Sequence, residues 1–131
     1  MAEALEPGVV ELARGPNFCA YAGLRPDGSP FNHILWVDCD DEHVVVNTEV
    51  HRAKAKWADQ EPRVAVVIWD ASDPYHYAEI RGQVVERVTG DEARAHIDAL
   101  SNKYTGKDYD PDAITSERVM LKIAPTRQRV Y

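Results

Sequence analysis

Two cations separated by one residue, Arg52 and Lys54, are the side chains of this chain best suited to holding an anion. They follow an apolar strand predicted at residues 43–48 and open a helix predicted at residues 51–59. The first N–H groups of a helix lack partners within it and carry partial positive charge, so a phosphate is stabilised there. Arginine adds paired hydrogen bonds and lysine a point charge. A solvated basic helix face is the alternative interpretation, and we expect the next cation, Lys56, to face water.

The elements around this basic pair are mainly strands. Alternating apolar residues and turn signals predict strands at residues 18–24, 31–37, 43–48, 63–69, 76–88 and 118–123. A short helix is predicted from Pro7, and a longer one from a capping box between Thr89 and Glu92. This layout predicts a single domain over residues 1–131, mainly β with helices (α+β), built on a six-stranded antiparallel barrel.

The predicted strand at residues 76–88 has two different faces. Its apolar face carries Ala78, Ile80, Val84 and Val88. The opposite face carries Tyr77, Glu79, Arg81 and Gln83. A polar face on a long strand of a barrel wall needs a partner, which a second protein chain would provide.

Composition excludes several classes of function. The chain has 131 residues and a formal charge of −7, which argues against binding nucleic acid or an acidic membrane. No apolar stretch resembles a membrane span or a signal peptide, and the two cysteines lack metal or redox spacing, so we expect reduced thiols and a cytoplasmic protein. The five histidines lack metal-ligand spacing, so no metal is expected. Nucleophile motifs and glycine-rich phosphate loops are also missing, which argues against nucleophilic catalysis and against a dinucleotide-fold or P-loop protein.

An ordered set of short motifs resembles a known family. In chain order these are Asp27-Gly28-Ser29-Pro30, Trp36, Asn47-Thr48, His51-Arg52-Ala53-Lys54, Glu61-Pro62-Arg63-Val64, Asp73-Pro74-Tyr75-His76-Tyr77 and Arg81-Gly82. They resemble the split-barrel family that includes pyridoxamine 5′-phosphate oxidase, from about Phe18 to the C-terminus. Within it the chain is most similar to the flavin/deazaflavin oxidoreductases of actinobacteria, many of which bind coenzyme F420. The resemblance implies a split β-barrel of the FMN-binding type.

The resemblance also implies where a cofactor would bind. The matching positions are Arg52 and Lys54 for the phosphate, Asn47, Thr48, Pro30 and Asn32 for the ring, and Tyr75 and Tyr77 reaching over from a second subunit. Relatives are homodimers with both sites in the interface, so a homodimer is expected here. For the two tyrosines, ordinary packing on a sheet is the alternative. Trp36 lies near the ring pocket, with a core position as its alternative.

This chain differs from the FMN-dependent members of the family at two places, and these differences indicate which cofactor to expect. Pyridoxamine-phosphate oxidases end in an Arg-x-His motif, whereas this chain ends in residues 124–131 without a histidine. The spacing of Arg52 and Lys54 resembles the deazaflavin branch more than the FMN enzymes. We therefore expect an F420-dependent oxidoreductase that passes hydride to a small conjugated or quinone-like electron acceptor. The alternatives are an FMN-binding oxidase-like protein and a non-catalytic flavin or F420 carrier. No catalytic acid or base is identifiable, and residues 105–115 show no pattern that would name a substrate.

Overall fold

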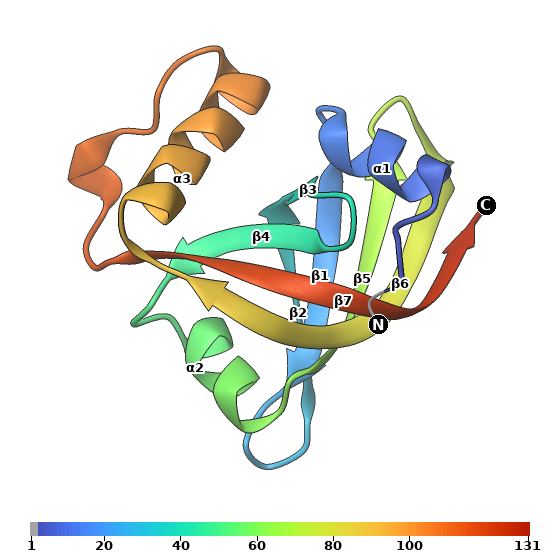
Figure 1. The fold of residues 1–131 in the computed structure, drawn as a ribbon, viewed down its shortest axis with the longest axis horizontal. Coiled ribbons are helices and arrows are strands. Elements are labelled where there is room, and N and C mark those ends of the chain that lie inside the picture. The colour runs from blue at the N-terminus through green and yellow to red at the C-terminus, as the bar shows by residue number, and fades with distance from the viewer. Residues whose placement is uncertain (1–2) are drawn as a thin grey trace.

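One antiparallel sheet curls into an open barrel in the computed structural model, which describes residues 3–131 (Figure 1). Its strands are β1 (Phe18–Leu24), β2 (Pro30–Trp36), β3 (Asp38–Cys39), β4 (Val44–Glu49), β5 (Arg63–Asp70), β6 (Asp73–Val88) and β7 (Arg118–Val130). The helices are α1 (Pro7–Arg14), α2 (Ala53–Gln60) and α3 (Gly90–Thr105), with a 3₁₀ turn at Pro111–Ala113. The predicted α+β split barrel is confirmed.

The sheet has seven strands in the order β2-β1-β5-β6-β7-β4-β3, where six were predicted. The additional strand is β3, whose two residues pair with the start of β4. A two-residue strand beside an acidic turn leaves no readable periodicity, which is why the sequence did not predict it. The order puts β2 at one edge of the sheet and β4, with its short partner β3, at the other. The barrel is therefore split between β2 and β4.

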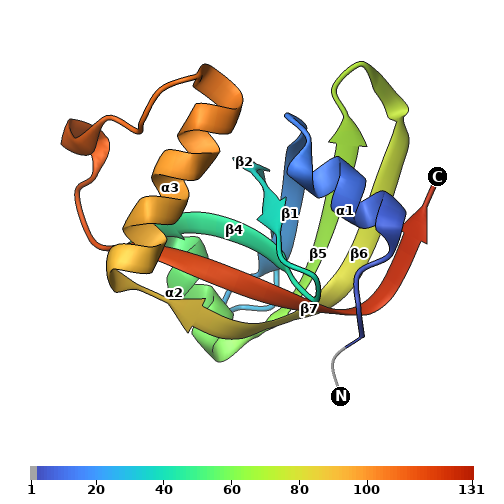
Figure 2. The same ribbon diagram turned by 45° about the horizontal axis from the view of Figure 1, so that its top comes forward.

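The helices cover different parts of the curled sheet (Figures 1 and 2). Helix α1 packs on β3, β5 and β6, while α2 packs against β1. Helix α3 lies over β4 and β7 and buries Ala93, Ile97 and Leu100 along one side. The capping box predicted at its start is wrong, because the Thr89 side chain makes no capping hydrogen bond. The Gly90 N–H instead donates to Glu117 Oε2 at 3.2 Å, from the segment just before β7.

Strand β7 runs past its predicted end at residue 123 and pairs with β6 from Ala78 to Val88. The register between the two strands shifts where Gly82 lies opposite Pro125. A bulge tolerates the proline, which has no N–H to donate to a regular ladder. A Cβ on Gly82 would lie 2.2 Å from the carbonyl oxygen of Ala124, so only glycine fits this crossing.

Candidate functional site

Strand β4 brings three polar side chains, Asn47, Thr48 and Glu49, to one end of the split. All six of its residues are buried, and successive side chains point to opposite faces. Val46 belongs to the barrel core, so Thr48 shares that inner face, whereas Asn47 and Glu49 face α3 and the loop after it. The family resemblance implies that Asn47 and Thr48 both lie along a cofactor ring. Their side chains lie on opposite sides of the strand, and only Asn47 borders the space under α3.

The predicted basic pair lies at the start of α2. Arg52 is the N-cap residue and its guanidinium is half exposed, whereas Lys54 is buried, with 9% of its surface exposed. Lys56 is exposed, as predicted. Burial lowers the pKa of Lys54, and the nearby Arg52 and Arg118 lower it further. Among the residues that the structure describes, no carboxylate forms an ion pair with Lys54.

A fully buried carboxylate, Glu49, lies beside two further cations, Arg52 and Arg118. Its Oε1 accepts hydrogen bonds from the N–H groups of Thr115 and Ser116 at 2.6 and 2.7 Å. Its Oε2 lies 3.4 Å from Arg52 and 3.7 Å from Arg118. Burial alone would raise the pKa of Glu49, but the two N–H donors and the Arg118 charge outweigh it and lower the pKa. Glu49 thus stays ionised and ties the loop before β7 to the end of β4.

A second chain of hydrogen bonds fixes Arg118. Its Nε donates to Asn47 Oδ1 at 2.9 Å. Asn47 Nδ2 donates to the Ala93 carbonyl at 3.1 Å and lies 3.0 Å from His96 Nδ1, while His96 Nε2 lies 3.1 Å from Asp38 Oδ2. This pattern requires His96 to carry its proton on Nε2 and to accept at Nδ1. The amide of Asn47 can then point only one way, so Arg118 is held in a single orientation.

Arg118 forms part of the wall of a pocket of about 330 Å³ between α3 and the barrel. The rest of the wall is mostly apolar and aromatic, with Phe18, Ile34, Leu35, Trp36, Asn47, Ile97, Leu100 and Tyr109. We call this space the α3 pocket. Through Arg118 the pocket adjoins the basic side chains at the start of α2, since the positive charge of Arg118 also lowers the pKa of Lys54. The cluster of basic side chains therefore continues into a cavity suited to a planar ring.

The other predicted cofactor residues lie elsewhere. Pro30 and Asn32 are exposed on the outer face of β2, where each pairs with a residue of β1. Tyr75, 87% exposed, lies near the start of β6, and Tyr77 stacks on Tyr131 with ring centroids 4.4 Å apart. Within one chain none of these four residues joins the cluster of Arg52 and Lys54.

Three residues of the site were not proposed from the sequence: Glu49, His96 and Arg118. Arg118 directly precedes the apolar run Val119-Met120-Leu121, and this is the one signal that could have found it. Glu49 gave no such signal, because Asn47 and Thr48 separate it from the apolar residues of its strand. His96 gave no signal, because its partners Asp38 and Asn47 lie far away in the sequence.

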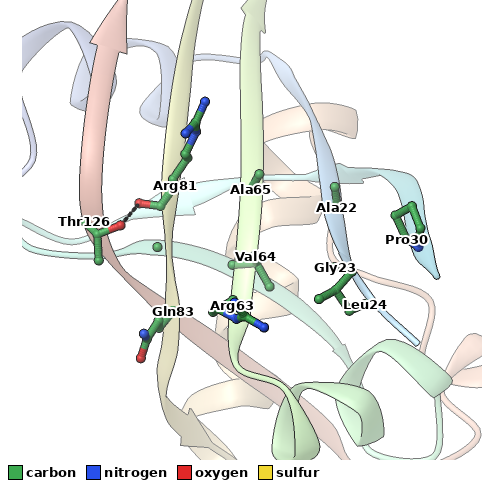
Figure 3. Close-up of a pocket in the computed structure, with 11 residues that line it drawn as sticks. Ala22, Gly23, Leu24, Pro30, Arg63, Val64, Ala65, Arg81, Gln83 and Thr126 are labelled. Atoms are coloured by element: carbon green, nitrogen blue, oxygen red, sulfur yellow. Dashed lines mark hydrogen bonds between the residues drawn. The ribbon is translucent and has the colours of Figure 1, made fainter. Parts of the chain in front are cut away.

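A second, open cavity of about 440 Å³ lies on the outer face of the sheet (Figure 3). Figure 3 shows Ala22 and Ala65 on its floor, with Arg81, Gln83 and Arg63 around it. Pro30 also lines this cavity. A predicted ring residue and the predicted partner-facing residues of β6 thus meet on one surface.

Several absences apply to residues 3–131. No group of three or more His, Cys, Asp or Glu side chains there gathers as a metal site would require. No helix in this part of the chain is long and apolar enough to cross a membrane. Cys19 and Cys39 are both free and buried.

Comparisons with known proteins give a consistent result. The sequence model of the pyridoxamine 5′-phosphate oxidase family matches residues 5–130. A structure named F420 reductase superposes with a TM-score of 0.82 at 30% identity, covering 95% of this chain and 98% of its own.

Two further solved structures share the fold at lower identity. A conserved hypothetical protein of Mycobacterium tuberculosis has a TM-score of 0.70 at 21% identity, covering 100% of this chain and 88% of its own. An FMN-binding, pyridoxamine 5′-phosphate oxidase-related protein of Nostoc punctiforme has a TM-score of 0.61 at 16% identity, with 86% and 72% covered. A comparison with curated proteins gave no match.

Proposed function

Since the chain belongs to the pyridoxamine 5′-phosphate oxidase family, we propose that it is an oxidoreductase that uses reduced coenzyme F420 to reduce a small conjugated or quinone-like acceptor. Its fold is the one that flavin-type oxidoreductases of this family use. FMN is the alternative cofactor. A cytoplasmic location, expected from the reduced cysteines, remains part of the proposal.

The observation that carries the proposal is the environment of Lys54. A buried ammonium group beside two other cations, with no carboxylate bound to it in the described chain, raises the free energy of the folded protein. A phosphate would remove that cost, because it would accept hydrogen bonds from Lys54 and Arg52 and from free N–H groups at the start of α2. The donor set therefore fits the phosphate of F420 or of FMN.

Two features favour F420 over FMN. The F420 reductase named above is similar to this chain over almost its whole length, while the FMN-binding relative shares only 16% identity. The single residue between Arg52 and Lys54 also resembles the deazaflavin branch of the family more than its FMN enzymes.

The chain's residues would bind the cofactor and the acceptor and orient them during this reaction. When bound, reduced F420 supplies a hydride. Lys54 and Arg52 would hold the phosphate, and the hydrogen bonds from Thr115 and Ser116 to Glu49 would hold the loop before β7 against the end of β4. The acceptor would gain the hydride at one atom and a proton from solvent at another.

Turnover separates an enzyme from a carrier. Reduced F420 mixed with the protein and menadione should be oxidised at least tenfold faster than in protein-free solution, as followed by the absorbance of the deazaflavin. A protein that binds F420 but leaves this rate unchanged with a panel of quinones and enones, both with and without a carboxylate group, would be a carrier.

We also propose a homodimer that buries the outer face of β6. Tyr77, Glu79, Arg81 and Gln83 share this face, as predicted, and the open, largely apolar cavity beside them extends over β1 and β5. Its floor of small side chains would let a second copy approach closely. Tyr75 and Tyr77 lie far from Lys54 within one chain, so they would contact a cofactor only if they belong to the partner's site.

Charge reversal at Arg81 tests the dimer. We expect Arg81→Glu to weaken self-association and cofactor binding together, because an interface group left without its partner carries a desolvation cost. Sedimentation velocity and cofactor titration measure the two effects. The control is Lys107→Glu, which makes the same change in charge on the exposed loop after α3 and should alter neither. If the wild-type protein is a monomer and still binds the cofactor at full strength, the cofactor sites are not shared between two subunits.

A further inference from the structure

The α3 pocket has one charged group in its wall, the guanidinium of Arg118. The residue is 7% exposed, so its charge has little solvent around it. Of its five N–H groups, one donates to Asn47 at 2.9 Å. The nearest carboxylate of the described chain, Glu49, lies at 3.7 Å, beyond hydrogen-bond distance. Arg118 therefore has donors to offer a ligand in the pocket.

The orientation of Arg118 is fixed before any ligand arrives. Asn47 holds the Nε side, and Asn47 is itself held by the Ala93 carbonyl and by His96. The ring of Tyr109 lies 5.3 Å from Arg118 Cζ. A guanidinium fixed in this way binds a carboxylate or another planar oxyanion through two parallel hydrogen bonds, with little loss of conformational entropy.

The remaining wall offers flat apolar surface next to this charge. Trp36 stacks on Tyr104 with ring centroids 5.0 Å apart and planes 9° from parallel, and Tyr109 meets Trp36 edge-on at 6.2 Å. Phe18 and Ile34 remain partly exposed at the pocket, at 38% and 69%. Such surfaces favour a planar conjugated ring, and the volume of about 330 Å³ lies at the small end of the range for ligand pockets.

We propose that the α3 pocket binds the acceptor, and that the acceptor is a planar conjugated carboxylate whose carboxylate is held by Arg118. This rests on the proposed function, because it needs a reduced cofactor beside the pocket. Lys54 and Arg52 do not line the pocket, so the cofactor phosphate and the acceptor carboxylate occupy different sides of Arg118. The acidic tail of F420 is the other source of a carboxylate. A mainly apolar, aromatic wall suits a ring better than a flexible polyanionic tail.

Calorimetry with two aromatic probes on the wild-type protein tests this assignment. We expect 2-naphthoate to bind at least tenfold more tightly than the neutral 2-naphthamide, which has the same shape. The preference should persist when the protein is saturated with F420. Equal affinities for the two probes would overturn the role of Arg118. Loss of naphthoate binding on saturation with F420 would assign the pocket to the cofactor instead.

A variant locates the binding site of the probe. Arg118→Lys keeps the charge near Glu49 but cannot form the paired hydrogen bonds, so naphthoate affinity should fall about tenfold while the amide is unaffected. An unchanged naphthoate affinity in the folded variant would contradict the proposal. If the variant does not fold, the two probes on the wild-type protein decide. Failure of both F420 and FMN to bind would overturn the proposed function, whereas F420 binding without a preference for naphthoate would overturn only this inference.

Discussion

Replacement of Glu49 by alanine should lower the free energy of unfolding by about 3–5 kcal/mol, since removing one partner leaves buried charges uncompensated. Arg118 would lose its nearest carboxylate, and the N–H groups of Thr115 and Ser116 would lose their acceptor. The isosteric Glu49→Gln keeps an oxygen for the two N–H groups but not the charge. It should therefore cost less, about 1.5–3 kcal/mol. Urea unfolding of both variants measures these losses.

The effect of Glu49 should also depend on pH. The pKa of Glu49 is lower in the folded protein than in the unfolded chain. Its stabilising contribution is therefore complete above the unfolded pKa and is lost as the pH falls through the folded pKa. The gap between wild type and Glu49→Gln should narrow on acidification.

Glu61 is the matched control for Glu49. It also pairs with an arginine, Arg63, but near the surface and only two residues away. Glu61→Gln should leave the stability almost unchanged. Equal losses at Glu49 and Glu61 would show that the buried network around Glu49 does not stabilise the fold.

The second large effect is expected at Lys54. Lys54→Ala should weaken F420 binding by about 1.5–3 kcal/mol, roughly 10- to 150-fold in Kd, because a charge-assisted contact to phosphate is lost. The same change should not destabilise the cofactor-free protein, since it removes a buried charge that lies beside two other cations.

Lys56→Ala is the control. Lys56 is exposed on the same helix, so it should contribute only a few tenths of a kcal/mol to the binding of F420. Lys54→Met keeps most of the buried stem and should lose affinity as Lys54→Ala does. Calorimetry measures the affinities and thermal unfolding the stabilities. Equal affinity losses at Lys54 and Lys56, or a full affinity in Lys54→Met, would remove Lys54 from the site.

Local patterns predicted the fold well. The alternation along β1, β5 and the first part of β6 needs only neighbouring residues, and the structure confirms it. The prediction that Val88 shares the face of Ala78, Ile80 and Val84 is wrong. A register shift between Val84 and Glu86 turns Val88 to the other side, where it packs with Ala93 and Met120. The end of β7 could not be predicted, since Pro125 is tolerated only because Gly82 of another strand lies opposite it. The predicted cap of α3 failed for a similar reason, because the Gly90 N–H finds its acceptor on Glu117.

The site could be predicted only where it is local. Arg52 and Lys54 lie two residues apart, and their positions at the start of α2 follow from the sequence. Glu49, Asn47 and Arg118 meet because β4 and β7 pair side by side, which spacing alone does not reveal. The cofactor roles of Pro30, Asn32, Tyr75 and Tyr77 depend on a second subunit, and they stay predictions.

The most direct measurement is a side-by-side titration of the cofactor-free protein with F420 and with FMN, read by calorimetry. We expect F420 to bind at least tenfold more tightly than FMN, and to bind weakly to Lys54→Ala and at full strength to Lys56→Ala. Tight binding of FMN together with no binding of F420 would contradict the assignment.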